Sequence, residues 1–341
     1  CISTRRVFAH SLKTTDKLVD ALPDEAAQMF DYDLVVVGGG SGGLAAAKEA
    51  AKLGARVALC DLVKPSETRG TIWGLGGTCV NVGCIPKKLM HTAAVHREQT
   101  KALAEAFGWE VPPTDAAPTI GWSALQDNVE NYIRSLNFGY VVQLRENNIK
   151  YLNTHAKFVG PHTLQCTNRR GDVTTITARR VLLAMGGRPT LPENVTGARD
   201  LGVTSDDVFR LKEDPGKTLV VGASYVALEC AGFLHGIGRN ATVMMRSVPL
   251  RGFDADMAQR VVSFMEKIGM RFIRKAAPVS LTKSDTGIDV SFLDEAGTLQ
   301  HETFDTVLFA TGRRPETHGM GLEDIGVQLQ KDGKVIVDPF D

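Results

Sequence analysis

The chain has 341 residues, with 39 Lys and Arg against 39 Asp and Glu, so its formal net charge is zero. A balanced charge gives no electrostatic reason to bind nucleic acid or an anionic membrane. No apolar run approaches the roughly eighteen residues that a membrane-spanning helix needs. The length exceeds that of one ordinary core and favours two domains.

Residues 1–30 are predicted to form a flexible segment before the first strand. The stretch is rich in basic residues, Ser and Thr, and no acidic residue precedes Asp16. This composition is typical of the end of an organellar transit peptide, and a flexible linker from an upstream domain fits nearly as well. The mitochondrion is therefore the predicted location, with the cytoplasm as the alternative.

A glycine-rich turn, GGGSGG, follows the apolar strand predicted over residues 33–37, and a helix is predicted over residues 44–53. In this order, Gly38 permits the tight turn, Gly40 lets a pyrophosphate approach the backbone, and Gly43 lets helix and strand pack closely. The free N–H groups at the start of such a helix attract phosphates. The pattern predicts a dinucleotide site.

An acidic residue follows the next predicted strand, residues 56–60. Asp61 lies about twenty positions after Gly40, where a carboxylate can accept hydrogen bonds from ribose hydroxyls. The alternative is a glycine turn without a ligand. The flanking strands and Asp61 argue against that alternative.

The same order recurs in the second half of the chain. A predicted strand over residues 218–221 is followed by Gly222 and by a helix predicted through Ala231. Ser224 and Ala227 occupy the second and third glycine positions, although small side chains still allow a close approach. Alone, this second motif would be weak evidence for a nucleotide.

The strand after the second motif ends in a cation. It is predicted over residues 241–245 and ends at Arg246, where an NAD site would have a carboxylate, and Arg251 follows. Guanidinium groups bind a 2′-phosphate through charge-assisted hydrogen bonds, whereas a carboxylate repels it. The second site is therefore predicted to prefer NADPH. The alternative is that both arginines are ordinary surface cations.

Two of the six cysteines, Cys79 and Cys84, lie close together in the sequence. Pro86 suits the first turn of a helix, which places Cys84 just before a helix N-terminus, with Lys87 and Lys88 beside it. Both influences stabilise a thiolate and are predicted to lower the pKa of Cys84. The remaining cysteines are predicted to be buried apolar residues, at positions 1, 60, 166 and 230.

Other interpretations of this cysteine pair exist. The spacing C-x-x-x-x-C differs from the C-x-x-C of zinc sites, and no second pair of ligands accompanies it, so no metal is predicted. Two unrelated buried cysteines are the other alternative. The glycines and lysines around the pair favour a redox dithiol.

Residues 73–91, WGLGGTCVNVGCIPKKLMH, resemble the active-site segment of the high-molecular-weight thioredoxin reductases of animals, within the pyridine nucleotide-disulfide oxidoreductases. Residues 222–234 and 245–254 are similar to the same proteins. The mitochondrial members are the nearest. The resemblance implies two Rossmann-like, doubly wound α/β domains that bind FAD and NADPH. Electrons would pass from NADPH through FAD to a Cys79–Cys84 disulfide and then to thioredoxin.

The resemblance also implies roles for single residues. Cys84 would be the thiolate beside the flavin, and Cys79 would be the interchange thiol. Thr78 and Lys87 would line the flavin, and Glu229 would pair with Lys87.

Further roles concern the nicotinamide and the connections between domains. Tyr225 would be a gate that moves when nicotinamide binds. Residues 184–187 and 310–313 resemble the two crossings between the domains. Met185 stands in the first crossing where threonine is usual, and Gly312 in the second is expected to border the cofactor.

The predicted organisation is an FAD domain over residues 31–190, an NADPH domain over 191–312, and a return to the first domain over 313–341. A surface loop is predicted over 110–118 and a hairpin over 286–303. The interface domain of the resembled proteins, with its catalytic His and Glu and its redox-active tail, is absent from the sequence. The chain is therefore expected to be C-terminally incomplete and not to turn over thioredoxin alone, whereas the full-length protein is expected to be a homodimer.

Three alternatives to this function remain. Glutathione reductase and thioredoxin-glutathione reductase belong to the same class of enzyme. A flavin-binding protein without dithiol chemistry belongs to another class, and the segment around Cys79 and Cys84 argues against it.

Overall fold

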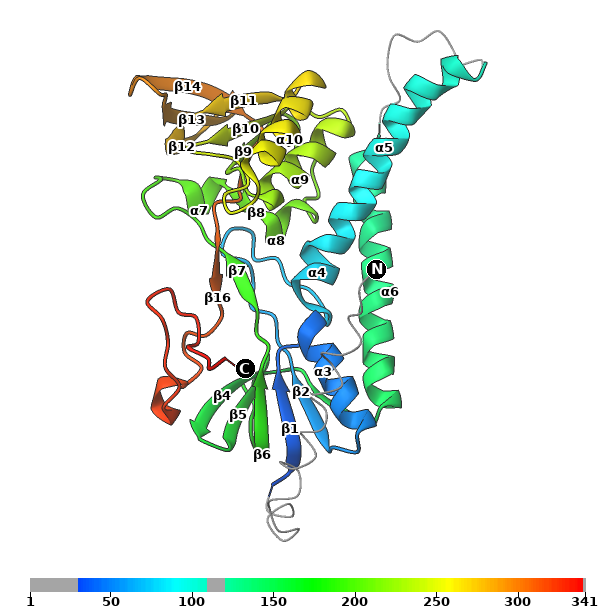
Figure 1. Cartoon of the computed structure of the whole chain (residues 1–341), viewed down its shortest axis with the longest axis vertical. Coiled ribbons are helices and arrows are strands. Elements are labelled where there is room, and N and C mark those ends of the chain that lie inside the picture. The colour runs from blue at the N-terminus through cyan, green and yellow to red at the C-terminus, as the bar shows by residue number, and fades with distance from the viewer. Residues whose placement is uncertain (1–29, 109–119, 340–341) are drawn as a thin grey trace.

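The computed structural model describes residues 30–108 and 120–339. Figure 1 shows two lobes stacked along the long axis of the molecule, each built around its own β-sheet. Residues 1–29 and the loop predicted over residues 110–118 lie outside the described residues.

Four parallel strands form the centre of the first lobe, in the order β3-β2-β1-β6. The long strand β6 then pairs antiparallel with β5, and β5 with β4. The second half of β1 and all of β2 are buried, as expected for parallel strands covered on both faces. The strands of this lobe are β1 (Tyr32–Val37), β2 (Val57–Cys60), β3 (Lys150–Leu152), β4 (Thr154–Gly160), β5 (Thr163–Asn168) and β6 (Val173–Leu183).

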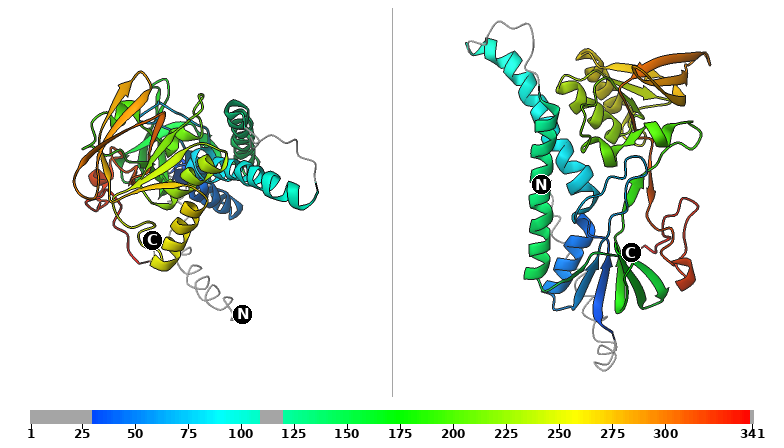
Figure 2. Two further views of the ribbon diagram at one scale, coloured as in Figure 1. Left: turned by 90° about the horizontal axis from the view of Figure 1, so that it is seen from above. Right: turned by 180° about the vertical axis from the view of Figure 1, so that it is seen from behind.

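Helices cover one face of this sheet and extend toward the second lobe. Helix α3 (Ser41–Lys52) packs on β1 and β2, and it begins three residues earlier than predicted because its first turn lies inside the glycine segment. The short helix α4 (Gly77–Val82) leads into α5 (Cys84–Ala106). Helix α6 (Trp122–Glu146) packs beside α5, and Figure 2 shows both running past the junction of the lobes.

The second lobe contains a parallel sheet in the order β11-β10-β9-β15-β8 and an antiparallel sheet in the order β12-β13-β14. Strands β13 and β14 confirm the predicted hairpin. Helix α9 continues to Gly236 rather than ending at Ala231, because Phe233 and Leu234 extend its buried surface. The elements are β8 (Val203–Thr204), β9 (Thr218–Val221), β10 (Ala241–Met245), β11 (Arg271–Arg274), β12 (Ala277–Ser284), β13 (Gly287–Leu293), β14 (Leu299–Phe304), β15 (Thr306–Phe309), α7 (Ala198–Leu201), α8 (Ser205–Val208), α9 (Tyr225–Gly236) and α10 (Ala255–Lys267).

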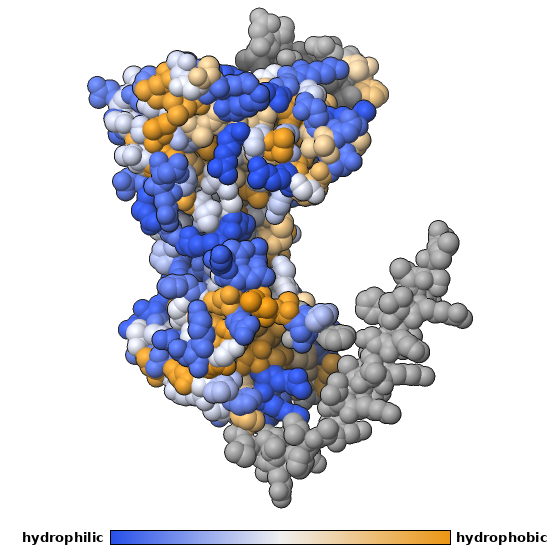
Figure 3. All heavy atoms as spheres, turned by 60° about the vertical axis from the view of Figure 1, so that its left-hand side comes forward, coloured by the Kyte–Doolittle hydropathy of each residue, from blue (hydrophilic) through white to orange (hydrophobic). Residues whose placement is uncertain are grey.

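Two chain segments connect the lobes side by side. Strand β7 (Gly187–Pro189) pairs antiparallel with β16 (Arg313–Pro315). Figure 3 shows that the narrow region between the lobes is largely hydrophilic. After β16 the chain returns to the first lobe, where the Met320 carbonyl accepts a hydrogen bond from the Phe158 N–H at 2.8 Å and a short 3-10 helix (Glu323–Ile325) follows.

Parallel sheets flanked by helices confirm the predicted α/β class with Rossmann-like topology in both lobes. In such sheets ligands bind at the carboxyl ends of the strands. The fold therefore directs attention to the ends of β1 and β2 and of β9 and β10.

Candidate active site

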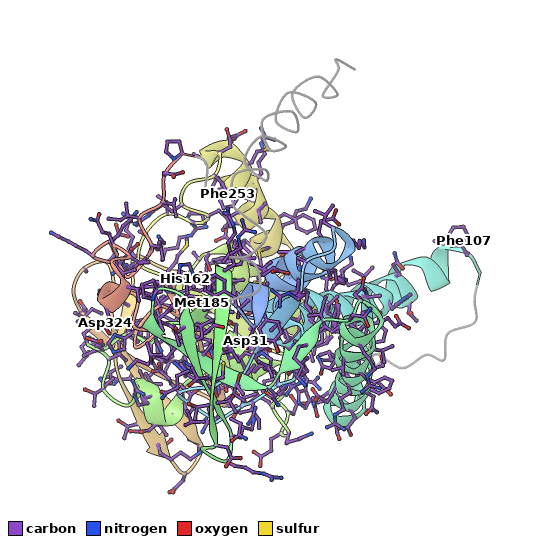
Figure 4. All side chains as sticks on the ribbon, turned by 90° about the horizontal axis from the view of Figure 1, so that it is seen from below. Asp31, Phe107, His162, Met185, Phe253 and Asp324 are labelled. Carbon is purple, nitrogen blue, oxygen red and sulfur yellow. The ribbon has the colours of Figure 1, made fainter. Side chains whose placement is uncertain are left out.

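A cavity of about 320 Å³ opens at the carboxyl ends of β1 and β2. Its wall contains the glycine turn, Asp61, Thr78 and Cys79. Met185, from the first crossing segment, borders the same cavity, and Figure 4 shows it near the middle of the first lobe. The first predicted nucleotide site is therefore next to a hollow that reaches the dithiol segment.

The glycines of the first turn have different surroundings. Gly38 has a φ of +112°, and a Cβ there would lie 2.2 Å from the Ala184 carbonyl oxygen. A Cβ at Gly43 would lie 1.9 Å from the Gly38 carbonyl oxygen, so both positions require glycine. At Gly40 the nearest atom to an added Cβ would be 3.7 Å away. A Cβ at Gly40 would thus make only ordinary contact, and the Gly40 backbone lies in the cavity wall, where a phosphate can approach it.

Asp61 supports this turn from the end of β2. Its Oδ1 accepts a hydrogen bond from the Gly39 N–H at 2.9 Å, and the Cys60 carbonyl accepts one from the Gly38 N–H at 2.8 Å. Burial raises the pKa of the Asp61 carboxyl, and the hydrogen bond from Gly39 opposes that effect. Asp61 is thus held in the cavity wall, in the position predicted for a ribose ligand.

Cys79 and Cys84 lie in consecutive helices. The Cys79 thiol is in the cavity wall, and the Cys84 thiol is near enough to act on its charge. Burial, reinforced by the neighbouring Cys84 thiol, raises the pKa of Cys79. Cys84 is exposed and is the first residue of α5 rather than the residue before it. The fold therefore places both free thiols together beside the glycine turn.

Within the described part of the chain, the cavity wall includes neither Cys84 nor Lys87. Lys87 Nζ instead donates to Glu229 Oε1 at 2.8 Å and so connects α5 to α9. The expected ion pair is present, but its side chains are 25% and 41% exposed. A pair with that exposure contributes about 1 kcal/mol or less to stability. Thr78 Oγ1 accepts a hydrogen bond from Arg313 Nη2 at 3.4 Å, which links α4 to β16.

A second cavity, of about 630 Å³, opens at the carboxyl ends of β9 and β10. A Cβ at Gly222, which has a φ of +126°, would lie 2.4 Å from the Ala310 carbonyl oxygen. This geometry repeats that of Gly38. The cavity wall brings together all the residues predicted for the second site, namely Gly222, Ser224, Tyr225, Arg246, Arg251 and Gly312.

The two non-glycine positions of the second motif are compatible with a nucleotide site. Ser224 Oγ accepts a hydrogen bond from the Ala227 N–H at 3.4 Å and caps α9. Ala227 is fully buried. Although Ser and Ala replace two of the three glycines, the second motif therefore still places a capped helix N-terminus at the cavity.

Two guanidinium groups border the second cavity. Arg246 and Arg251 are both exposed, and Arg251 Nη2 donates to Ser247 Oγ at 2.9 Å. Neither arginine forms an ion pair with a carboxylate of the described residues. Tyr225 is 56% exposed at the start of α9, one helical turn before Glu229. The second cavity thus offers two cations without a protein anion to neutralise them.

Residues 32–340 match the family model described as pyridine nucleotide-disulphide oxidoreductase. The chain belongs to this family. Thioredoxin reductase SEP1 of Emiliania huxleyi is 52% identical over 311 residues, which cover 91% of this chain and 61% of that protein. Thioredoxin reductases of two Plasmodium falciparum isolates, FCH-5 and 3D7, are each 48% identical over 313 residues, or 91% of this chain. The matches cover 56% and 49% of those proteins, so this chain spans about half to three fifths of its relatives' length.

In this member of the pyridine nucleotide-disulphide oxidoreductases, the structure also brings together residues that the sequence analysis did not single out. Arg188 borders the first cavity, donates through Nε to Asp206 Oδ2 at 2.7 Å, and lies 4.7 Å from the centroid of the Trp73 ring. Burial raises the pKa of Asp206, and the Arg188 cation opposes it. These residues come from three separate segments. Only the position of Arg188, directly after the first crossing segment, was a signal that sequence reasoning could have used.

Among the described residues, no helix combines the length and the apolar character required to cross a membrane. No group of three or more His, Cys, Asp or Glu among them is arranged to hold a metal ion.

Proposed function

We propose that this chain is the dinucleotide-binding part of an NADPH-dependent flavoprotein disulfide reductase whose full-length form reduces thioredoxin. One observation carries the proposal: Cys79 lies in the wall of the first cavity, next to the glycine turn and beside the Cys84 thiol. Family membership and relatives named thioredoxin reductase support it.

The first cavity suits FAD. The Gly40 backbone in the cavity wall and the start of α3 would hold the pyrophosphate, and Asp61 would accept hydrogen bonds from the ribose. Thr78 and Cys79 border the same cavity, which places the dithiol within reach of a group bound along the turn. The chemistry that bound FAD supplies is two-electron transfer between a nicotinamide and a disulfide.

The second cavity suits NADPH. The helix N-terminus capped by Ser224 would bind the pyrophosphate, and Arg246 and Arg251 would bind the 2′-phosphate. Tyr225 is exposed in the same wall, where it would move aside for the nicotinamide. Unpaired cations here explain a preference for the phosphorylated cofactor.

The dithiol would reduce a partner disulfide by two successive exchanges. The Cys79 thiolate attacks one sulfur of the partner, which forms a mixed disulfide and releases the first partner thiolate. The Cys84 thiolate then attacks the Cys79 sulfur, which closes the Cys79–Cys84 disulfide and releases the second partner thiolate. Lys87, within the first turn of α5, would stabilise the Cys84 thiolate through its charge.

The absorption spectrum of the FAD-loaded, full-length protein tests this proposal. Anaerobic addition of NADPH is expected to produce a long-wavelength band from a thiolate next to oxidised flavin. The band should be lost in Cys84→Ser and retained in Cys79→Ser. Bleaching of the flavin without such a band in any variant would overturn the proposal and favour a flavin-binding protein without dithiol chemistry.

The identity of the disulfide substrate is tested separately. NADPH oxidation by the full-length protein is expected to be much faster with thioredoxin than with oxidised glutathione. A faster rate with oxidised glutathione would replace thioredoxin reductase by glutathione reductase, and comparable rates would favour thioredoxin-glutathione reductase.

We also propose that the full-length protein is of the high-molecular-weight type, forms a homodimer and is mitochondrial. The segment at residues 73–91 and the basic N-terminal composition support these statements. Sedimentation of the full-length protein at the mass of a dimer is the expected result. Recovery of the native protein in the cytosolic rather than the mitochondrial fraction would contradict the location.

A further inference from the structure

A second pair of thiols lies behind the first cavity. Cys60 Sγ and Cys166 Sγ are 3.8 Å apart, and both side chains are buried. Cys60 ends β2, whereas Cys166 lies on β5, so the pair joins the parallel sheet to the antiparallel strands packed against it. Neither sulfur takes part in the exchange at Cys79 and Cys84.

We propose that Cys60 and Cys166 form a second redox-active dithiol, which closes to a disulfide when a hydroperoxide enters the first cavity. Cys60 and the neighbouring Thr154 both lie in the wall of that cavity, which gives a small oxidant a route to the pair. Closure requires the sulfurs to approach from 3.8 Å to about 2.05 Å. Both side chains lie in the same buried hydrophobic cluster with their sulfurs already in contact, so the remaining approach is less than about 2 Å.

The surroundings of the pair favour a thiolate. The hydrogen bond with Cys166, together with burial, raises the pKa of Cys60. The same hydrogen bond lowers the pKa of Cys166. The neighbouring Thr154 hydroxyl is buried and has no hydrogen-bond partner among the described residues. The proton between the two sulfurs can lie on either atom. Cys60, which lies in the cavity wall, is therefore the first nucleophile, and Cys166 behind it is the resolving thiol.

The reaction balances with the hydroperoxide as the oxidant. With its proton passed to Cys166, the Cys60 thiolate attacks the peroxide, the O–O bond breaks, and the products are a Cys60 sulfenic acid and an alkoxide, which takes up a proton. The Cys166 sulfur then attacks the sulfenic sulfur, and water leaves as the S–S bond forms. In sum, two thiols and one hydroperoxide give a disulfide, an alcohol and water.

The new bond would stabilise the strand end that carries the glycine turn. The Cys60 carbonyl accepts the Gly38 N–H at 2.8 Å, and the adjacent Asp61 carboxylate accepts the Gly39 N–H. Linking residues 106 positions apart also restricts the unfolded chain strongly. The expected effect is a rise of several degrees in the unfolding midpoint of the cofactor-free protein. Formation of the Cys60–Cys166 disulfide does not depend on the proposed function, whereas protection of this pair from oxidation by bound FAD does.

Non-reducing peptide mapping tests the pair directly. The cofactor-free chain is treated with a slight excess of hydrogen peroxide, its remaining thiols are alkylated in denaturant, and it is digested with trypsin. The expected product is a cross-linked species of residues 57–69 and 158–169, two hydrogen masses below the sum of the peptides. Recovery of both peptides alkylated, in protein whose Cys79–Cys84 pair has oxidised, would overturn the proposal.

Thermal unfolding before and after peroxide treatment supplies the second measurement. It is made in a Cys79→Ser, Cys84→Ser background, so that no other proposed disulfide contributes. The rise in midpoint is expected to disappear in Cys166→Ala and to persist in Cys230→Ala, a matched change at a buried cysteine elsewhere in the fold. An equal rise in both variants would contradict the proposal. Slower cross-linking with bound FAD supports the cavity assignment, and an unchanged rate would count against that assignment but not against the dithiol.

Discussion

The two glycine turns of this chain share a backbone design. The Gly38 N–H donates to the Cys60 carbonyl at 2.8 Å, and the Gly222 N–H donates to the Met244 carbonyl at 2.9 Å. In each turn a positive φ brings the first glycine against a carbonyl oxygen of a neighbouring segment. The first glycine therefore sets the strand-to-helix turn in both lobes.

The remaining positions differ between the turns. The first turn retains Gly40 and Gly43, whereas the second has Ser224, which caps its helix, and Ala227. The strand that follows ends at Asp61 in the first lobe and at Arg246 in the second. The comparison teaches that one glycine maintains the turn in both lobes, while the charge at the end of the next strand differs between them.

The largest expected effect comes from the glycine that both turns share. Gly38→Ala and Gly222→Ala should each lower the free energy of unfolding by about 2 kcal/mol or more, since alanine is strained at positive φ and its Cβ would meet a carbonyl oxygen. Urea denaturation of each variant measures the loss.

Helical glycines in the same lobes provide controls for these variants. An added Cβ at Gly42 or Gly232 meets nothing within 4 Å. Gly42→Ala and Gly232→Ala should therefore leave stability unchanged or raise it by up to about 1 kcal/mol. If Gly38→Ala behaves like Gly42→Ala, the first glycine does not set the turn.

The second largest expected effect tests the difference in charge between the strand ends of the two lobes. Arg246→Ala should weaken NADPH binding roughly 10- to 100-fold, because a hydrogen bond to a charged group contributes about 1.5–3 kcal/mol. NADH binding should hardly change. Titration calorimetry with both cofactors measures the ratio, and Arg260→Ala, which changes an exposed arginine paired with Asp256, is the control. Equal losses for the two cofactors would show that Arg246 does not recognise the phosphate.

The smallest effect concerns pH and the carboxylate of the first lobe. Burial raises the pKa of Asp61 above its usual 3.8, so the folded protein binds this proton more tightly than the unfolded chain. The proton stabilises the folded state at low pH, and its contribution is lost as the pH rises through the raised pKa. Asp61→Asn should therefore flatten the pH dependence of unfolding of the cofactor-free protein by about 1 kcal/mol or less.

Urea denaturation at several pH values, from 3.8 upward, measures this change. Asp256→Asn, which alters an exposed carboxylate, is the matched control. Identical pH profiles for the two variants would mean that the Asp61 charge is not desolvated in solution.

Much of the local structure could be predicted. Strands β9 and β10 have the expected bounds, and the hairpin of β13 and β14 confirms the turn signal between them. Errors arose at helix ends. The start of α3 was placed too late because glycine is a poor helix former, yet packing of the helix against β1 and β2 overrides that preference. The length of α9 was underestimated because burial, not periodicity, defines it.

The positions of both glycine turns and of the Cys79 and Cys84 segment follow from the sequence by itself, since they depend on steric rules and spacings within a few residues. Tertiary structure alone decided which distant groups meet: Cys60 with Cys166, and Arg188 with Asp206. Such contacts depend on how sheets and lobes pack. The residues near each of these groups in the sequence do not determine that packing. It depends on the balance between the chain entropy lost when distant residues come together and the free energy gained by burial throughout the core.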